Sequence, residues 1–267
     1  MFSKSIQIMG ILNVTPDSFY DGGKYYKKEL AVRQGLRLAN EGADIIDIGG
    51  ESSRPGAKPI SIKEEIRRVI PVIEGIRKKS ETTISIDTYK SKVAEEAMRS
   101  GANIVNDISA LRADKKMAET VQKYNASIVL MHMQGTPQNM QKNPSYKDVI
   151  AEICNFLRGR INFAEEQGIK AKKIIIDPGI GFGKTVEHNL LIIKHLKKFK
   201  LLKKPILIGV SCKSFIGKIL NLPEEERLEG TLAAICISVM NGANILRVHN
   251  VKETKRAVEV VEAILYH

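Results

Sequence analysis

The sequence has no tryptophan, only three cysteines and no long apolar run, and each shortage argues against a class of protein. The cysteines, Cys154, Cys212 and Cys236, are odd in number and lack CxxC spacing, so neither a disulfide framework nor a zinc knuckle is indicated. The apolar runs are far shorter than a membrane span, and the N-terminus lacks a secretory or transit pattern. We therefore expect a protein of the reduced cytoplasm that has no membrane partner.

Basic residues outnumber acidic ones and give a formal net charge of +12. The lysines are scattered, often in pairs such as Lys78–Lys79 and Lys197–Lys198, and they do not combine with aromatic residues into one stripe. We interpret the charge mainly as a solvated lysine-rich surface, with attraction of a phosphorylated small substrate as the functional alternative. A nucleic-acid partner is not expected.

Short apolar runs rich in β-branched residues recur along the chain, each followed by a segment of helical period. Their nearly continuous apolar character is typical of parallel strands that are covered on both faces. The strands are predicted at residues 6–14, 43–50, 82–88, 103–109, 127–133, 173–178, 205–211 and 243–249.

The segments between these runs carry helix signals. Ile62, Ile66, Val69, Ile73 and Ile76 form one apolar stripe at a spacing of three or four residues. The stripe follows Ser61-x-x-Glu64, which has the pattern of a capping box. Glycines at positions 42, 101, 168 and 242 stand where a helix stops in a left-handed residue.

The motifs EGADIIDI, SGANIVND and NGANILRV repeat one pattern in which a helix stops and a strand begins. Eight strand–helix alternations within 267 residues predict an α/β protein with a single (β/α)₈ barrel as one domain over residues 1–267. A doubly wound sheet is the alternative, but it would concentrate polar residues at one switch point.

Polar residues are instead distributed over the ends of all the predicted strands. In a parallel barrel these ends face one shared cavity, and a buried polar group is unfavourable without a partner. The pattern therefore predicts an active site at this end of the barrel. The residues are Asn13, Asp47, Asp87, Asn106 with Asp107, His132, Asp177, Lys213, and Arg247 with His249.

The segment 177–185, DPGIGFGKT, resembles a phosphate loop but fails the Walker A pattern, because Pro178 stands where a glycine is needed. Its glycines are interpreted as allowing the backbone to approach a flat ligand, on which Phe182 can stack. The loops 15–23 and 51–56 contain glycine or proline with polar groups, as mobile lids do.

Motifs along the whole chain resemble the dihydropteroate synthase family, which sulfonamide drugs inhibit. They are MGILNVTPDSF, GADIIDIGGESSRPG, SIDTYK, NDIS, MHMQGTP, DPGIGFGKT, GVSCKSFIG and RVHNV. The resemblance implies the same barrel fold and a transferase of folate biosynthesis. That enzyme condenses 6-hydroxymethyl-7,8-dihydropterin pyrophosphate with p-aminobenzoate and displaces pyrophosphate dissociatively.

The resemblance also implies roles for individual residues, with Mg²⁺ as cofactor, these small molecules as partners and a homodimer as the assembly. The expected pterin residues are Asp87, Asn106, Asp177, Lys213, Met131 and Phe182. The expected pyrophosphate residues are Asn13, Ser53, Arg54, Arg247 and His249, with Asn13 also the expected metal ligand. For p-aminobenzoate binding and loop closure the expected residues are Phe19, Pro55, Ser214, Asp17 and Asp21.

One departure from the family pattern concerns p-aminobenzoate. Cys212 stands where the family usually has arginine, which removes a cation near the expected carboxylate site. Three other functions are alternatives for this sequence. They are a pterin-binding methyltransferase barrel acting on a methylated folate and a corrinoid protein, a binding module without catalysis, and a metal hydrolase. The expected pyrophosphate residues argue against the first, and the absence of HxH or HxxxH pairs argues against the last.

Overall fold

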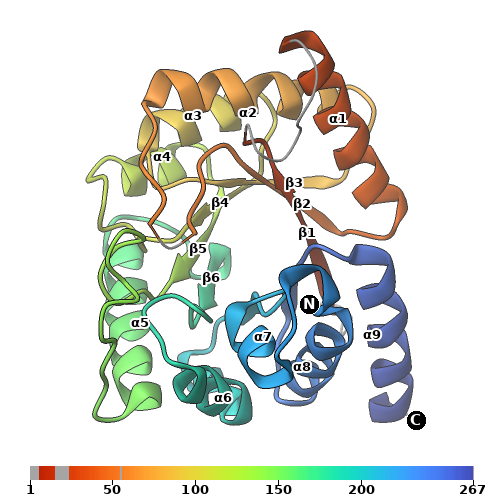
Figure 1. The fold of residues 1–267 in the computed structure, drawn as a ribbon. Helices are drawn as coiled ribbons and strands as arrows, with labels where there is room; N and C mark the ends of the chain where they lie inside the picture. The colour runs from red at the N-terminus through yellow and green to blue at the C-terminus, as the bar shows by residue number, and fades with distance from the viewer. Residues whose placement is uncertain (1–5, 16–23, 55, 267) are drawn as a thin grey trace.

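Eight parallel strands form the inner wall of the molecule, and helices surround them (Figure 1). The computed structural model describes residues 6–15, 24–54 and 56–266. The strand order is β6-β5-β4-β3-β2-β1-β8-β7. A parallel bridge between Ile176 and Ile206 joins the two ends of this order and closes the ring. The predicted (β/α)₈ barrel is therefore confirmed over the doubly wound alternative.

Each observed strand lies within a predicted run, and most are shorter at both ends. The seventh is the most reduced and contains only Leu207 and Ile208. The strands are β1 Gln7–Asn13, β2 Ile45–Gly49, β3 Thr83–Asp87, β4 Ile104–Asp107, β5 Ser127–Met131, β6 Ile174–Asp177, β7 Leu207–Ile208 and β8 Ile245–Val248.

The helices follow the strands in regular alternation, with short 3₁₀ segments in the second half of the chain. The α-helices are α1 Lys24–Asn40, α2 Ile62–Arg77, α3 Ser91–Arg99, α4 Met117–Lys123, α5 Val149–Glu166, α6 Val186–Lys194, α7 Ser214–Leu220, α8 Leu228–Met240 and α9 Val251–Tyr266. The 3₁₀ segments are η2 Ala171–Lys173, η3 Leu196–Leu202 and η4 Glu224–Glu226.

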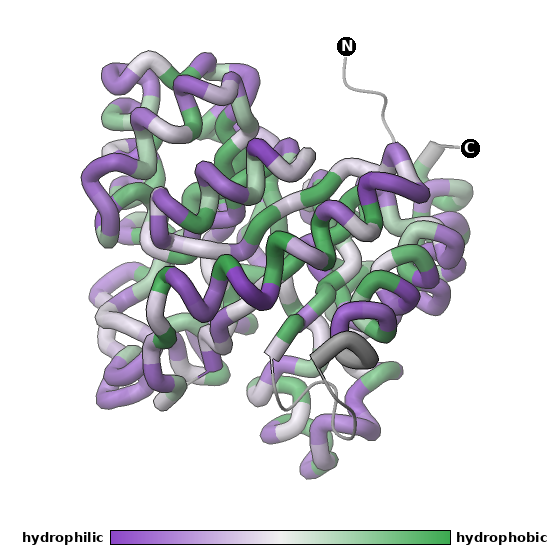
Figure 2. The backbone as a smooth tube through the Cα atoms, turned by 90° about the horizontal axis from the view of Figure 1, so that it is seen from above, coloured by the Kyte–Doolittle hydropathy of each residue, from purple (hydrophilic) through white to green (hydrophobic). Residues whose placement is uncertain are grey.

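The local signals of helix start and stop are largely confirmed. The Ser61 hydroxyl accepts the backbone N–H of Glu64 at 3.2 Å and caps α2. Glycines 42, 101, 168 and 242 all have positive φ and follow helix ends. One member of the predicted stripe is not buried: Ile62, the first residue of α2, is 44% exposed. In Figure 2 the outer helices alternate hydrophilic and hydrophobic positions, as amphipathic helices do.

Two apolar layers hold the barrel together. The outer layer packs the helices on the strands and contains fully buried side chains such as Ile48, Ile73, Ile84 and Phe199. The inner layer fills the barrel with side chains from seven of the eight strands. Its members are Met9, Ile45, Ile104, Val129, Ile175, Leu207 and Ile245. This inner layer lies directly below the polar cavity.

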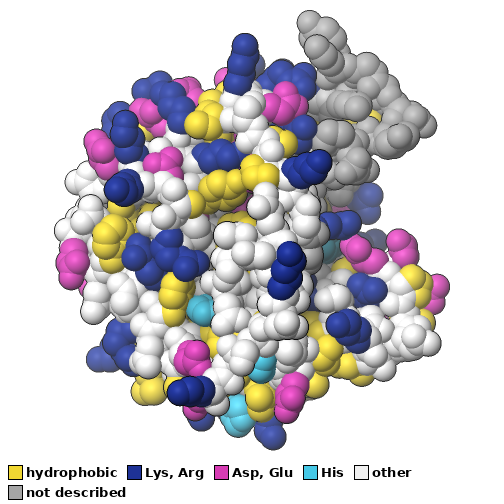
Figure 3. All heavy atoms as spheres, turned by 60° about the vertical axis from the view of Figure 1, so that its left-hand side comes forward, with side chains coloured by type: hydrophobic (Ala, Val, Ile, Leu, Met, Phe, Trp, Pro, Cys, Tyr) yellow, Lys and Arg dark blue, Asp and Glu magenta, His cyan; other side chains and the backbone are white. Residues whose placement is uncertain are grey.

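Within the described ranges, no helix is both long and apolar enough to cross a membrane. The face in Figure 3 carries lysine and arginine side chains that are dispersed among acidic and neutral ones. This dispersal agrees with the scattered lysines of the sequence.

Candidate active site

The polar residues of the cavity follow the inner apolar layer by two positions along their strands. Because side chains alternate between the two faces of a strand, the residue two places further along points into the same interior. Ile45 is thus followed by Asp47, Ile104 by Asn106, Ile175 by Asp177 and Ile245 by Arg247, whereas Val129 is followed by the apolar Met131. The side chains placed in this way are Asp47, Asn106, Met131, Asp177 and Arg247, and β3 contributes Asp87, which pairs in register with Asn106.

Arg247 lies at the centre of this polar layer. Its Nε donates to Asp47 Oδ2 at 2.6 Å, and a terminal nitrogen donates to Asp87 Oδ2 at 2.7 Å. Asn106 Nδ2 also donates to Asp47 Oδ2, at 3.1 Å. Asp47 has no exposed surface, so it orients both Arg247 and Asn106 from below. The sequence placed Arg247 with the pyrophosphate residues, whereas the structure joins it to a predicted pterin carboxylate.

Burial governs the protonation of the acidic residues. Burial raises the pKa of Asp87, and the neighbouring Arg247 opposes this rise. Burial also raises the pKa of Asp177 to about 6, although it accepts the backbone N–H of Gly179 at 2.7 Å. Burial alone would lower the pKa of Arg247, but Asp47 and Asp87 raise it above its ordinary value. The site therefore holds a permanently charged arginine against carboxylates that are protonated more easily than in water.

An apolar wall lies beside these carboxylates and meets a lysine. Met131 and Phe182 belong to one buried cluster with Ile108, Met133 and Met140. Lys213 Nζ lies 4.4 Å from the centroid of the Phe182 ring, within the range of a cation–π contact. Burial lowers the pKa of Lys213 to about 8. The Lys213 ammonium group therefore lies over the Phe182 ring, and both residues line the cavity.

The loop that carries Phe182 depends on a second buried lysine. Lys184 is 3% exposed, and its Nζ donates to Phe182 O at 2.9 Å and lies 3.0 Å from His132 Nδ1. Burial and the Lys184 charge lower the pKa of His132 to about 2, so this imidazole is neutral and its Nδ1 can accept a hydrogen bond from Lys184. Gly179 has φ of +73°, and a Cβ there would lie 1.9 Å from His132 O. Gly179 is therefore needed for close approach to the His132 backbone, approach to a flat ligand stays a prediction, and Lys184 holds the loop from within.

The predicted pyrophosphate residues line the same cavity, which has a volume of about 880 Å³. Asn13, Ser53, Arg54 and His249 are on its wall together with Arg247. Arg54 is largely exposed and pairs with Glu224 at 2.9 Å. His249 Nδ1 lies 3.0 Å from Ser211 Oγ, and burial lowers its pKa to about 4. His249 is therefore a neutral hydrogen-bonding group at neutral pH.

The p-aminobenzoate predictions are covered only in part. Ser214 lies on the wall of the cavity at the start of α7. Phe19, Pro55, Asp17 and Asp21 lie outside the described residues.

The structure also brings residues to the site that the sequence did not single out. Arg227 and Lys218 line the cavity beside Cys212. Arg227 donates to the backbone carbonyl of Cys212 at 3.0 Å. Neither cation follows a strand end, so the strand-end pattern had no means of finding them.

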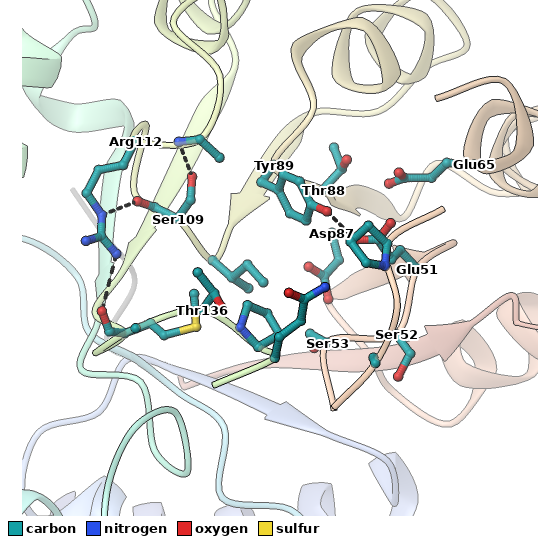
Figure 4. Close-up of a pocket in the computed structure, with 18 residues that line it drawn as sticks. Glu51, Ser52, Ser53, Glu65, Asp87, Thr88, Tyr89, Ser109, Arg112 and Thr136 are labelled. Carbon is teal, nitrogen blue, oxygen red and sulfur yellow. Dashed lines mark hydrogen bonds between the residues drawn. The ribbon is translucent and has the colours of Figure 1, made fainter. Parts of the chain in front are cut away.

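A smaller cavity of about 420 Å³ opens beside the first, and Asp87, Ile108, Glu51, Ser52 and Ser53 line both. Figure 4 shows this side cavity, with the Tyr89 hydroxyl pointing toward Glu51 and with Arg112 on the opposite wall. Glu51 and Tyr89 lie in the motifs GADIIDIGGESSRPG and SIDTYK, but the resemblance to the family implies no role for either residue.

The cavity has few groups that could hold a metal ion by themselves. No cluster of three or more His, Cys, Asp or Glu side chains with suitable placement occurs in the part of the chain that the structure describes. Mg²⁺ is commonly bound through one or two protein oxygens together with substrate phosphates. The amide oxygen of Asn13 on the cavity wall fits this second mode.

The chain is similar to known proteins over nearly its whole length. Residues 9–249 match the family described as pterin binding enzyme. A dihydropteroate synthase of Clostridium beijerinckii is 48% identical over 97% of this chain and 94% of the relative.

Two solved structures of the Xanthomonas albilineans dihydropteroate synthase are similar in fold. The structure with 4-aminobenzoic acid has a TM-score of 0.93 and 43% identity, covering 98% of this chain and 94% of that chain. The structure with 7,8-dihydropteroate has a TM-score of 0.89 and 40% identity, covering 98% and 95%.

Proposed function

The chain belongs to the pterin-binding enzyme family, and we propose that it catalyses the dihydropteroate synthase reaction of folate biosynthesis. It condenses 6-hydroxymethyl-7,8-dihydropterin pyrophosphate with p-aminobenzoate and releases 7,8-dihydropteroate and pyrophosphate. The observation that carries this function is the meeting of Asp87, Asn106, Asp177 and Lys213 around one cavity of about 880 Å³. Relatives of this activity share nearly half of the sequence.

The deep end of the cavity suits a pterin ring. The heterocycle presents N–H donors and acceptor atoms along one edge, and carboxylates and an amide can satisfy both kinds. Asp87, Asn106 and Asp177 supply these groups from neighbouring or nearby strands of the wall. Phe182 offers an apolar ring on the cavity wall, and Lys213, whose Nζ lies over that ring, offers a charged donor to the heterocycle.

The open end of the cavity suits the diphosphate. The exposed Arg54 guanidinium group pairs with Glu224 at 2.9 Å, a pair of the weak surface kind that an anion can replace. Ser53 supplies a hydroxyl, and neutral His249 can donate from Nε2 while Nδ1 faces Ser211. Arg247 remains in this set as a proposal, because its described contacts are to Asp47 and Asp87.

The reaction needs no protein nucleophile. The amine nitrogen of p-aminobenzoate forms a bond to the pterin methylene carbon, the carbon–oxygen bond breaks, and pyrophosphate leaves with the electron pair. The amine then loses one proton to solvent or to pyrophosphate. Positive charge develops on the pterin as the bond breaks, and the fixed carboxylates of Asp87 and Asp177 stabilise it. Arg54 and the other donors stabilise the charge of the leaving group.

Mg²⁺ is proposed as the cofactor, with Asn13 as its protein ligand. When bound, the ion would neutralise charge on the leaving pyrophosphate. Loss of activity on chelation, restored by added Mg²⁺, would support this role.

A homodimer and a cytoplasmic location are also proposed. Ile237 and Met240 on α8 and Val260 and Ile264 on α9 are apolar and each at least 49% exposed. The two helices pack against each other, so these side chains could bury one another between two copies. Light scattering coupled to size-exclusion chromatography tests the dimer, and cell fractionation tests the location.

The central test is release of pyrophosphate by purified protein with Mg²⁺ and the pterin pyrophosphate. We expect release that depends on p-aminobenzoate, with 7,8-dihydropteroate formed in equal amount. Absence of release in the presence of both substrates would reject the proposed reaction.

A further inference from the structure

The loop of residues 51–60 connects β2 to α2 and carries two of the proposed diphosphate residues, Ser53 and Arg54. Its two ends are joined directly. The backbone N–H of Ile60 donates to Glu51 Oε2 at 2.7 Å, so the last residue of the loop is bonded to the first. This closure fixes the base of the loop but not its position relative to the rest of the site.

Lys90 fixes that position from the segment between β3 and α3. Its Nζ lies 2.7 Å from Glu51 Oε2, 2.8 Å from Ile60 O and 2.6 Å from Glu65 Oε2. An ammonium group has three N–H donors, so each is directed to one acceptor. The Lys90 side chain is only 12% exposed and that of Glu65 only 1% exposed, which limits competition by water. Both ends of the loop and the start of α2 therefore converge on one buried ammonium group.

Tyr89 adds a second link from the same strand end. Its hydroxyl donates to Glu51 Oε1 at 2.5 Å, so both oxygens of Glu51 are engaged. Figure 4 shows Tyr89 and Glu51 side by side, with Asp87, Ser52 and Ser53 around the same cavity. Tyr89 and Lys90 follow Asp87 by two and three residues. The loop proposed to hold the diphosphate is thus bonded to Tyr89 and Lys90, which continue the same backbone segment from Asp87, the residue proposed to read the pterin.

We propose that Lys90 is a positioning residue for the reaction, because it sets the distance between the pterin carboxylate Asp87 and the diphosphate loop 51–60. The inference rests on the proposed function, in which one substrate contacts both. It assigns Lys90 no contact with substrate. Its consequence is selective: loss of the ammonium group weakens recognition of the diphosphate and leaves recognition of the pterin ring intact.

The experiment compares two ligands by isothermal titration calorimetry. One is 6-hydroxymethyl-7,8-dihydropterin pyrophosphate and the other is 6-hydroxymethyl-7,8-dihydropterin, which lacks the diphosphate. For Lys90→Met we expect the Kd of the first to rise by about 10- to 100-fold, the range that a misplaced binding group produces. The Kd of the second should change by less than about twofold. Lys90→Arg should restore most of the lost affinity, because it keeps a cation that can reach the same acceptors.

Two further variants keep the test decisive. Lys90→Met/Glu65→Gln preserves the net charge of the cluster, so it provides the measurement if the single variant does not fold. Lys204→Met removes another buried lysine, which pairs with Glu165 at 2.7 Å at the opposite end of the barrel, and should change neither Kd. Equal loss of affinity for both ligands, or no loss for either, would overturn the inference. Failure of the wild-type protein to bind the pyrophosphate ligand would instead reject the proposed function.

Discussion

The guanidinium group of Arg247 donates to Asp87 at 2.7 Å, and the two residues stand 160 positions apart in the chain. The carboxylate proposed to read the pterin is therefore ion-paired before substrate binds. A second bond at 2.6 Å ties the same arginine to Asp47, which has no exposed surface. Substrate thus meets a carboxylate whose orientation is already fixed, which reduces the entropy lost on binding.

The first prediction concerns the charge of Asp87. Asp87→Asn keeps the shape but removes one of the two carboxylates that balance Arg247, and it removes the charge proposed to stabilise the cationic pterin. We expect kcat/KM for the pterin substrate to fall by about 100-fold or more, as loss of such a group commonly causes. Asp44→Asn is the control, because Asp44 accepts the Ile8 N–H at 2.8 Å at the opposite end of the barrel. Equal kinetics for the two variants would contradict the assignment.

A second prediction concerns Cys212, which lies on the cavity wall beside Lys213. Cys212→Arg introduces a cation near the expected carboxylate of p-aminobenzoate. A charge-assisted hydrogen bond there should lower the apparent KM for p-aminobenzoate by about 10-fold, while kcat changes little. Steady-state kinetics with varied p-aminobenzoate measures the effect. Cys212→Ser changes the thiol without adding charge and should leave the KM for p-aminobenzoate unaltered. If Cys212→Arg also leaves this KM unaltered, a cation at position 212 does not contribute to binding the carboxylate of p-aminobenzoate.

The third prediction concerns stability in acid. Burial and the Lys184 charge lower the pKa of His132 from 6.5 to about 2 in the folded protein. Between these values the unfolded chain binds the proton and the folded protein does not, so the free energy of unfolding decreases as pH falls below about 6.5. His132→Gln keeps an acceptor for Lys184 and removes this proton. Urea unfolding at several pH values should show a slope shallower by about 1 kcal/mol per pH unit.

His249 titrates in part of the same range, since its folded pKa is about 4. Between about pH 4 and 6.5, both histidines therefore contribute to the pH dependence of the free energy of unfolding of the wild-type protein. The difference between the wild type and His132→Gln gives the contribution of His132 alone. Identical slopes would show that His132 is protonated in the folded protein.

The fourth prediction concerns Gly179 in the loop beneath the cavity. A Cβ at this position would lie 1.9 Å from His132 O, and φ is +73°. Gly179→Ala should lower the free energy of unfolding by about 3 kcal/mol or more and abolish pterin binding, because strain and a clash with backbone combine. Gly168→Ala is the matched control: φ is +84°, but the nearest atom would be 3.4 Å away. Its loss should be about 1 kcal/mol, with binding unchanged. Similar losses at both positions would exclude the clash as the cause.

Much of the architecture could be predicted from the sequence. The β-branched runs and the glycine stops predicted every strand, and the polar residues at the strand ends predicted the face of the barrel that carries the cavity. These features are local, because strand period and helix capping depend on residues that are close together in the chain. The shortened β7 and the exposed Ile62 were missed, since the length of an element at its ends depends on packing with neighbours.

The pairing of charges was decided by the tertiary structure alone. Sequence reasoning grouped Arg247 with the pyrophosphate residues, but closure of the ring places β8 beside β1 and directs Arg247 to Asp47 and Asp87. Lys90 and Glu51 belong to two separate sequence motifs, and nothing in either motif indicates that they form an ion pair. They are in contact because β2 and β3 are neighbouring strands. The sequence by itself determined most of the polar groups at the strand ends, because strand period is local, but not Arg227 and Lys218, which reach the cavity from other elements. Which of the cavity groups bond to one another followed from barrel closure, because contacts between residues far apart in the chain have no local signature.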